Sequence, residues 1–234
     1  YLRTPRPADA SPQAQADGLL MPYKVSTWDE IPDNVKDADG NWYGDYYGVM
    51  AFGVNKDIVP NTPADWADLL KPEYANTVAL TGDPRASNQA ILAILSAGMS
   101  RGAAPGKDSG DKGLEFFAEL NTAGNFVPVS GKTGTIAQGA TPIVIGWDYN
   151  LLAWRDGMAG NPPMDVVVPA SGVLAGVYVQ AISAYAPHPN AAKLGCWSKR
   201  RVQRPRNRRS SRLSSSMMTT HRWSLWSMCW RNSS

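Results

Sequence analysis

Residues 78–89 place the tightest constraint on the fold of this chain, because they change from a strand pattern to a helix pattern within one short stretch. The apolar run from Thr77 to Leu80 is β-prone, and a polar turn follows it. Two helix starts are open: at Pro84 with Asp83 as the N-cap, or one turn later with Ser87 as the N-cap. The helix is expected to bury one stripe, formed by Ala90, Ile91, Ile94 and Leu95.

The turn between this strand and this helix is a candidate binding site. The first N–H groups of a helix have no partner within the helix, and the helix dipole makes that end positive. Asp83, Arg85, Ser87 and Asn88 add a carboxylate, a guanidinium, a hydroxyl and an amide. The turn therefore suits an anion or a polar solute. The alternative is an ordinary strand-to-helix turn whose cap satisfies these N–H groups.

Along the whole chain, strand patterns alternate with helix patterns. Expected strands are 42–55 (one strand or a hairpin), 77–80, 126–129, 142–146, 165–168 and 176–184, and an expected helix at 62–70 has Thr62 as its cap and Pro63 at its first position. Such alternation is typical of a mostly parallel sheet wrapped by helices. Ligands of such folds bind at the carboxyl ends of strands. The turns at 81–88, 130–135 and 147–150 are therefore expected to converge on one cleft.

Two aromatic segments are candidates for the wall of that cleft. Residues 42–55 hold more Trp and Tyr than a core requires, and Tyr47 lies within them. Trp147, Asp148 and Tyr149 follow the apolar run 142–146. Aromatic rings with polar tips line solute pockets, but they also pack in cores. Both interpretations stay open for residues 42–55.

Charge divides the chain into two compositions. The last 40 residues hold ten of the 23 Lys and Arg and none of the 20 Asp and Glu, so residues 1–194 carry a net charge of −7. Both cysteines, Cys196 and Cys229, lie in this basic segment, which excludes a disulfide or a cysteine metal site from the rest. A nucleic-acid-binding arm is one interpretation of the segment. A reading-frame slip or an unrelated graft is the interpretation we favour, so we expect no nucleic-acid partner.

No enzyme motif in the sequence is complete. Ser130-Gly131-Lys132-Thr133 lacks the earlier glycine of a phosphate-binding loop, because position 126 is Phe126. Residues 1–194 contain a single histidine, His188, which lies between two prolines. It is a poor general base, so we expect no enzyme. No apolar run reaches the ~18 residues of a membrane span, and no secretory signal is visible in a chain that begins at Tyr1.

Five ordered pieces of the sequence carry a family resemblance. They are Tyr47-Gly48-Val49…Val54-Asn55, Pro63-x-x-Trp66-x-x-Leu69-x-x-Pro72, Asp83-Pro84-x-x-Ser87-Asn88, Val167-Val168-Pro169-x-x-Gly172 and Ala186-Pro187-His188-Pro189-Asn190-Ala191-Ala192-Lys193. The set resembles the extracytoplasmic solute-binding proteins of ABC importers, in the group that includes iron(III), polyamine, thiamine and phosphonate binders. The resemblance covers roughly residues 16–194.

By this resemblance the fold is α/β, a periplasmic-binding-protein-like two-lobe fold with the solute in the interlobe cleft. Residues 1–59 form a partial first lobe with the first crossing strand, residues 60–165 a nearly complete second lobe, and residues 166–194 the return crossing. Residues 195–234 are expected to be a disordered or non-native, out-of-frame basic tail. Both ends depart from the family pattern, so the chain is identified as a truncated or frame-shifted member.

The resemblance also implies a function, that of a monomeric periplasmic or extracytoplasmic protein that passes a small solute to an ABC permease. The alternatives are an enzyme on a similar two-lobe α/β scaffold and nucleic-acid binding by the basic tail. The expected solute is an iron(III) complex, a polyamine or an anionic metabolite, and no cofactor is expected other than iron(III) as cargo. Iron-binding members use two neighbouring tyrosines where this chain has residues 147–150, so Tyr149 and Asp148 are the candidate metal ligands. An ammonium group suits Trp147 and Asp148 equally. The predicted ligand-binding residues are Asp83, Arg85, Ser87, Asn88, Trp147, Asp148, Tyr149 and Tyr47.

Overall fold

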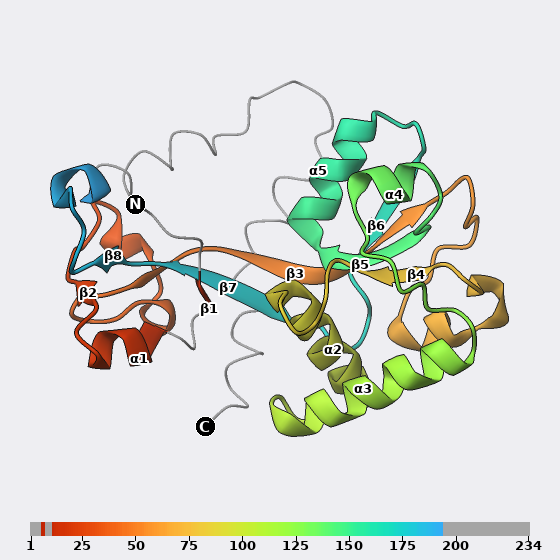
Figure 1. Ribbon diagram of the computed structural model, residues 1–234, viewed down its shortest axis with the longest axis horizontal. Coiled ribbons are helices and arrows are strands. Elements are labelled where there is room, and N and C mark those ends of the chain that lie inside the picture. The colour runs from red at the N-terminus through yellow and green to blue at the C-terminus, as the bar shows by residue number, and fades with distance from the viewer. Residues whose placement is uncertain (1–5, 8–10, 194–234) are drawn as a thin grey trace. The chain divides into compact units, whose positions relative to one another are not determined.

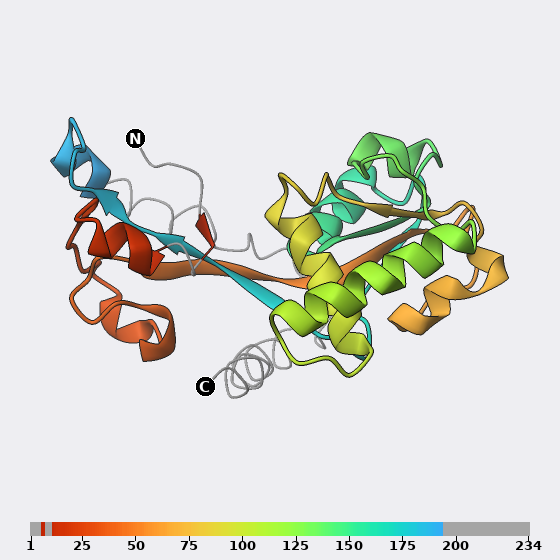
Figure 2. The same ribbon diagram turned by 60° about the horizontal axis from the view of Figure 1, so that its bottom comes forward.

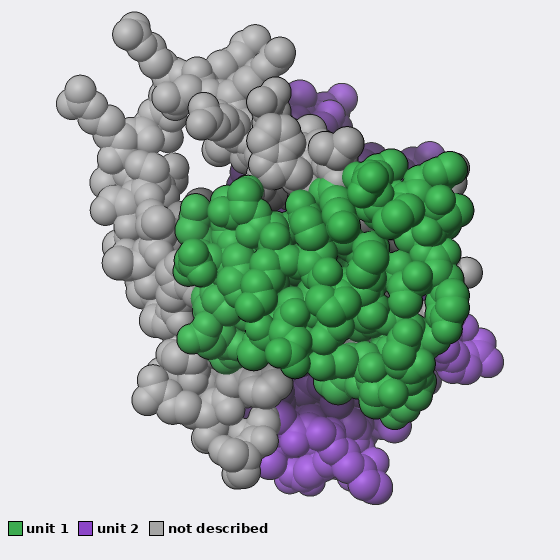
Figure 3. All heavy atoms as spheres, turned by 90° about the vertical axis from the view of Figure 1, so that its left-hand side faces the viewer, with its two compact units in different colours: residues 1–47, 176–220 green, residues 48–175, 221–234 purple. Residues whose placement is uncertain are grey.

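The computed structural model describes residues 6–7 and 11–193 (Figure 1). They fall into two compact units, coloured separately in Figure 3. Unit 1 comprises the described residues up to Tyr47 and those from Gly176 onward, and unit 2 comprises Gly48–Ala175. The basic segment 195–234, with the predictions made for it, lies outside the described residues. No helix in the described part of the chain combines the length and the apolar character that a membrane crossing requires.

Unit 1 is built from short elements around a small aromatic core. Its elements are β1 (Arg6–Pro7), α1 (Ser11–Ala16), β2 (Leu20–Met21), the 3-10 helices η2 (Trp28–Glu30) and η3 (Asp33–Val35), β7 (Ala175–Gln180) and β8 (Ile182–Ser183). Strand β1 pairs antiparallel with β7, and β2 pairs antiparallel with β8. Trp28 meets Tyr43 edge-on, with 6.1 Å between ring centroids, beside the buried Val25 and Ile182.

One long strand, β3 (Tyr43–Asn55), carries the chain from unit 1 into unit 2. The sequence allowed a strand or a hairpin here, and the structure forms a single strand of 13 residues. Within unit 1, Tyr43 Oη donates a hydrogen bond to Gln180 Oε1 (3.0 Å), and Gln180 Nε2 donates to Asp45 (2.8 Å), so β3 is fastened to β7. From Gly48 to Asn55 every residue of β3 is buried.

The sheet of unit 2 is mixed, which corrects the expectation of a mostly parallel sheet. Strand β4 (Val78–Leu80) pairs parallel with β5 (Ile143–Trp147). Strand β3 pairs antiparallel with β5 on one side and with β6 (Met164–Val167) on the other. Strands β4, β5 and β6 therefore run the same way, as helical crossovers require, and β3 opposes them because it enters from unit 1.

Two local predictions within unit 2 are wrong. Residues 126–129 contribute only one parallel bridge, between Phe126 and Val78, rather than a strand. The expected helix at 62–70 is instead the 3-10 helix η4 (Trp66–Leu70), with Asp65 rather than Thr62 as its N-cap. The Asp65 carboxylate accepts the Trp66 N–H (2.8 Å), whereas the Thr62 hydroxyl donates to Asp165 (2.7 Å). A second 3-10 helix, η5 (Pro72–Tyr74), follows.

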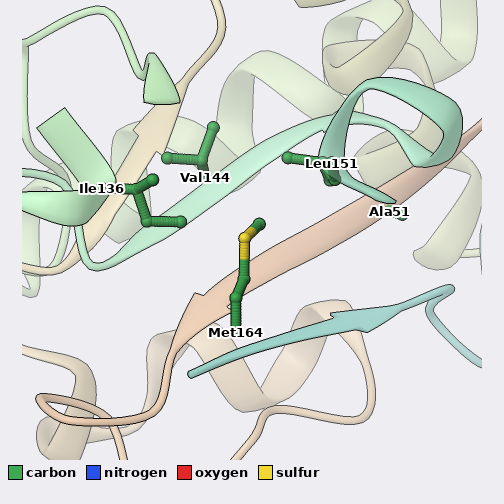
Figure 4. Packing of buried hydrophobic residues seen from close by; sticks show 5 residues of the cluster. All are labelled: Ala51, Ile136, Val144, Leu151 and Met164. Atoms are coloured by element: carbon green, nitrogen blue, oxygen red, sulfur yellow. The ribbon is translucent and has the colours of Figure 1, made fainter. Parts of the chain in front are cut away.

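Helices cover both faces of this sheet (Figures 1 and 2). Helices α4 (Thr133–Ala137) and α5 (Asp148–Met158) cover the face with the buried cluster of Figure 4, whose members are Ala51, Ile136, Val144, Leu151 and Met164. Helices α2 (Asn88–Ser100) and α3 (Lys107–Thr122) pack against each other on the opposite side. On that side Trp66 lies edge-on to Phe52 and to Phe116, with centroids 5.1 and 5.7 Å apart.

The buried stripe of α2 differs from the predicted one. Ala90 is buried as expected, but Ile91 is 42% exposed. The fully buried positions of α2 carry small residues, namely Ala90, Ala93, Ser96, Ala97 and Gly98. Because α3 packs closely against this stripe, side chains larger than these would hold the two helices apart.

Candidate functional site

Three turns that lead into helices lie at one edge of the unit 2 sheet, and we call them together the carboxyl edge: residues 81–88, 130–135 and 147–150. Leu80 and Ile145 are partners in the parallel ladder, and Thr81 Oγ1 donates a hydrogen bond to the Ile145 carbonyl (3.0 Å). The Gly131 N–H donates to the Leu80 carbonyl (2.8 Å). These contacts place the turns at the same edge of the sheet, and a shared cleft stays a prediction.

Asp83 and Arg85 bind each other in the first turn. The Asp83 carboxylate accepts hydrogen bonds from the Arg85 Nε, the Arg85 NH2 group (2.6 Å) and the Arg85 backbone N–H (2.9 Å). The Arg85 side chain is 90% exposed. This ion pair cancels both charges locally, so each residue offers a solute less than its formal charge suggests.

Helix α2 begins at Asn88 with Ser87 as its N-cap, so the later of the two predicted starts is confirmed. The Ser87 hydroxyl accepts the Ala90 N–H (3.4 Å) and donates to the Thr81 carbonyl (3.3 Å). The Asn88 side chain is half-buried, and its amide makes no hydrogen bond with the described residues. Asn88 thus presents an amide at the start of the helix.

Gln89 is a candidate that sequence reasoning missed. Its Nε2 lies where a side chain at Gly146 would begin, so the glycine in β5 makes room for this amide. Gln89 is half-buried and belongs to the first turn of α2. The glycine in the strand pattern was the available signal, because glycine inside a strand often marks a close approach.

Trp147, Asp148 and Tyr149 form the third turn at the carboxyl edge. Asp148 is the first residue of α5, and its Oδ1 accepts the Val49 N–H (2.9 Å). Trp147 is 1% exposed, whereas Asp148 and Tyr149 are half-buried. The accessible surface of this turn therefore comes from Asp148, Tyr149 and Asn150, and a role for the Trp147 indole in binding stays a prediction.

The remaining site predictions concern Tyr47 and iron. Tyr47 is half-buried and is the last residue of the first segment of unit 1, whereas the other seven predicted residues belong to unit 2. Tyr149 and Asp148 are neighbours in α5 and stay the predicted ligands of an iron(III) cargo. Within residues 6–7 and 11–193, no group of three His, Cys, Asp or Glu side chains is placed to hold a metal ion.

The Asp83–Arg85 pair gives a testable pH dependence. Hydrogen bonds from the Arg85 guanidinium and from its backbone N–H lower the pKa of Asp83 to about 2. Since the folded pKa is below the ordinary value of about 3.9, the pair stabilises the fold above about pH 4 and loses this effect as the pH falls towards 2. NMR titration of the Asp83 carboxyl should give a pKa of about 2.

Arg85→Ala should move the Asp83 pKa upward, towards the ordinary value. The matched control is Lys132→Ala, because Lys132 lies at the same edge and forms no ion pair with the described residues. Lys132→Ala should leave the pKa of Asp83 unchanged. An Asp83 pKa that does not change in Arg85→Ala would contradict the pairing.

Comparison with known proteins agrees with this architecture. The family model described as "Bacterial extracellular solute-binding protein" matches residues 8–195. A spermidine/putrescine-binding periplasmic protein of Salmonella typhimurium is 48% identical over 50 residues, which is 21% of this chain and 14% of that protein.

Solved structures show the same fold at low sequence identity. The periplasmic binding protein AfuA from Actinobacillus pleuropneumoniae, with fructose-6-phosphate bound, has a TM-score of 0.65 and 24% identity over 82% of this chain and 60% of its own. The apo ferric ion-binding protein A of Pasteurella haemolytica has a TM-score of 0.58 and 19% identity over 84% of this chain and 62% of its own. This chain thus spans about three fifths of the length of these structures. It belongs to the family of bacterial extracellular solute-binding proteins.

Proposed function

We propose that this chain captures a small polar solute at the carboxyl edge of unit 2, as the extracytoplasmic component of an ABC importer. The observation that carries the proposal is that three turns leading into helices lie at one edge of the sheet in a member of this family. The partner is a membrane permease, to which the chain delivers its solute. The proposal includes no catalytic step, and turnover of a bound probe would count against it.

The groups at the carboxyl edge suit a solute that carries charge. The Ser87 hydroxyl takes up the Ala90 N–H, so the backbone N–H groups and side-chain amides of Asn88 and Gln89 are the donors offered to an anionic group. The Asp148 carboxylate accepts one hydrogen bond from Val49 and keeps a second oxygen without a partner among the described residues. That oxygen and the Tyr149 phenol suit an ammonium group or iron(III).

The three solute classes can be separated by titration. The names of the related proteins supply one probe for each class: spermidine, a ferric salt held soluble as citrate, and fructose-6-phosphate. The full chain is titrated with each probe while tryptophan fluorescence and binding heat are followed. We expect saturable binding of one class with a micromolar dissociation constant, which corresponds to about 8 kcal/mol. Binding of none of the three would contradict the proposal.

Asp148→Asn should distinguish a cationic solute from an anionic one. The amide keeps an oxygen that accepts the Val49 N–H but removes the negative charge. Spermidine or iron(III) should therefore bind roughly tenfold to a hundredfold more weakly, because a charge-assisted hydrogen bond contributes about 1.5–3 kcal/mol. An anionic solute should bind equally well or more tightly.

The matched control for this experiment is Asp156→Asn. Asp156 lies in the same helix and forms a surface ion pair with Arg155 at 3.0 Å, away from the first turn. The Asp156→Asn substitution removes the same charge from the chain but should leave the dissociation constant of the solute unchanged. Equal effects of the two variants would show that net charge, rather than the position of Asp148, determines the affinity.

A further inference from the structure

A glycine of β3 lies directly against the aromatic side chains of the third turn. Gly48 is buried, and a Cβ atom built on it would lie 2.6 Å from Tyr149 Cε1 and 2.9 Å from Trp147 Cε3. Real Cβ atoms essentially never approach other heavy atoms within 3.0 Å. Both rings therefore occupy space that any other residue at position 48 would fill.

The two residues after Gly48 continue this contact. The Val49 N–H donates a hydrogen bond to Asp148 Oδ1 (2.9 Å), and Met50 is the ladder partner of Trp147. Three consecutive residues of β3 thus meet three consecutive residues of the turn, each by a different interaction. The contact lies at the first residues of unit 2, just after the chain has left unit 1 at Tyr47.

We propose that Gly48 is a positioning residue of the solute site, because the missing side chain sets where the Trp147 and Tyr149 rings lie beside Asp148. The inference rests on the proposed function at the carboxyl edge. Asp148 holds the turn through its bond to Val49, and the absence of a Cβ at position 48 lets the rings close against the strand. The Tyr149 ring and the Asp148 carboxylate are thereby held in one arrangement beside the strand.

Gly53, in the same strand, provides a control that distinguishes this positioning role from a general effect on core packing. A Cβ on Gly53 would meet Met164 Cε and, at 2.8 Å, Leu151 Cδ2, which are side-chain ends in the buried cluster of Figure 4. Gly53→Ala therefore disturbs the core, whereas Gly48→Ala disturbs the aromatic turn. Both variants add one methyl group to one buried strand, so they are matched in chemistry and differ in location.

The test compares wild type, Gly48→Ala and Gly53→Ala as full chains labelled with 5-fluorotryptophan. The fluorine resonance of Trp147 is assigned from its loss in Trp147→Phe. Affinity is measured by calorimetry with spermidine, ferric citrate and fructose-6-phosphate, and thermal melting reports stability. We expect Gly48→Ala to shift the Trp147 resonance and to weaken binding roughly tenfold or more, since displacements of about 1 Å at a preorganised site have effects of this order.

Gly53→Ala should lower the melting temperature and leave the dissociation constant of the folded protein unchanged. An unshifted Trp147 resonance in Gly48→Ala would overturn the inference. If the wild type binds a probe, a shifted resonance in Gly48→Ala with the same affinity as the wild type would also overturn it. If the wild type binds no probe, the proposed function fails. The resonance alone then decides whether Gly48 positions the ring, and a shift in Gly48→Ala but not in Gly53→Ala supports it.

Discussion

Replacing Gly98 with alanine should lower the free energy of unfolding by about 3 kcal/mol or more, because α2 and α3 leave no room for a methyl group where they cross. A Cβ on Gly98 would lie well inside 3.0 Å of the Ser109 carbonyl oxygen in α3. A Cβ on Gly113 would approach the Ile94 carbonyl oxygen in α2 equally closely. The obstructing atoms are backbone atoms, so no side-chain rotation relieves the overlap and the helices must separate.

The measurement is the thermal melting temperature, with Gly157→Ala as the matched control. Gly157 lies in α5, and a Cβ there would meet nothing within 4 Å. Its replacement should raise stability by up to about 1 kcal/mol, because alanine is the better helix former. Gly98→Ala should lower the melting temperature by roughly 6–12 °C in a chain of this size. A shift within 1 or 2 °C of wild type would show that the helices separate at little cost.

The second of the five family pieces contributes side chains to the core of unit 2. In the piece Pro63-x-x-Trp66-x-x-Leu69-x-x-Pro72, Trp66 and Leu69 are both 0% exposed, and Trp66 joins β3 to α3 through edge-on contacts with Phe52 and Phe116. This explains why the fold could be predicted from spacing while the solute could not. Core packing requires particular sizes at particular positions, whereas solute specificity depends on a few polar groups.

The carboxyl edge itself was predictable, because polar turns after apolar strands are visible in the sequence. The contacts that the side chains of this edge make with each other were not predictable. Whether Asp83 faces a solute or binds Arg85 depends on the backbone of one turn, and the structure forms the ion pair. The burial of Trp147 depends on Gly48 and Met50, which lie about a hundred residues earlier and reach it only through the β3–β5 ladder. Long-range contacts of this kind leave no local pattern.

Gly172, which ends the fourth of the five family pieces, is also required by a close backbone contact. Gly172 has a φ of +60°, and a Cβ there would meet the Ser96 carbonyl oxygen and, at 2.8 Å, the Ser100 backbone nitrogen of α2. The Gly172 carbonyl accepts a hydrogen bond from the Ser96 hydroxyl, and the neighbouring Ser171 donates to Asp65 from both its N–H and its hydroxyl. These bonds fix the segment that leads into β7 onto unit 2.

Gly172→Ala should therefore lower the free energy of unfolding by about 3 kcal/mol, the sum of a left-handed backbone penalty of about 1 kcal/mol and the displacement of the segment from α2. Gly102→Ala isolates the first contribution, because Gly102 has a φ of +79° and open space at its Cβ position. It should cost about 1 kcal/mol in urea unfolding. Amide exchange at Ser171, whose N–H is bonded to Asp65 (3.1 Å), should accelerate in Gly172→Ala alone. Equal losses of stability in the two variants would show that the segment moves away from α2 without cost, and that the backbone conformation alone requires glycine at position 172.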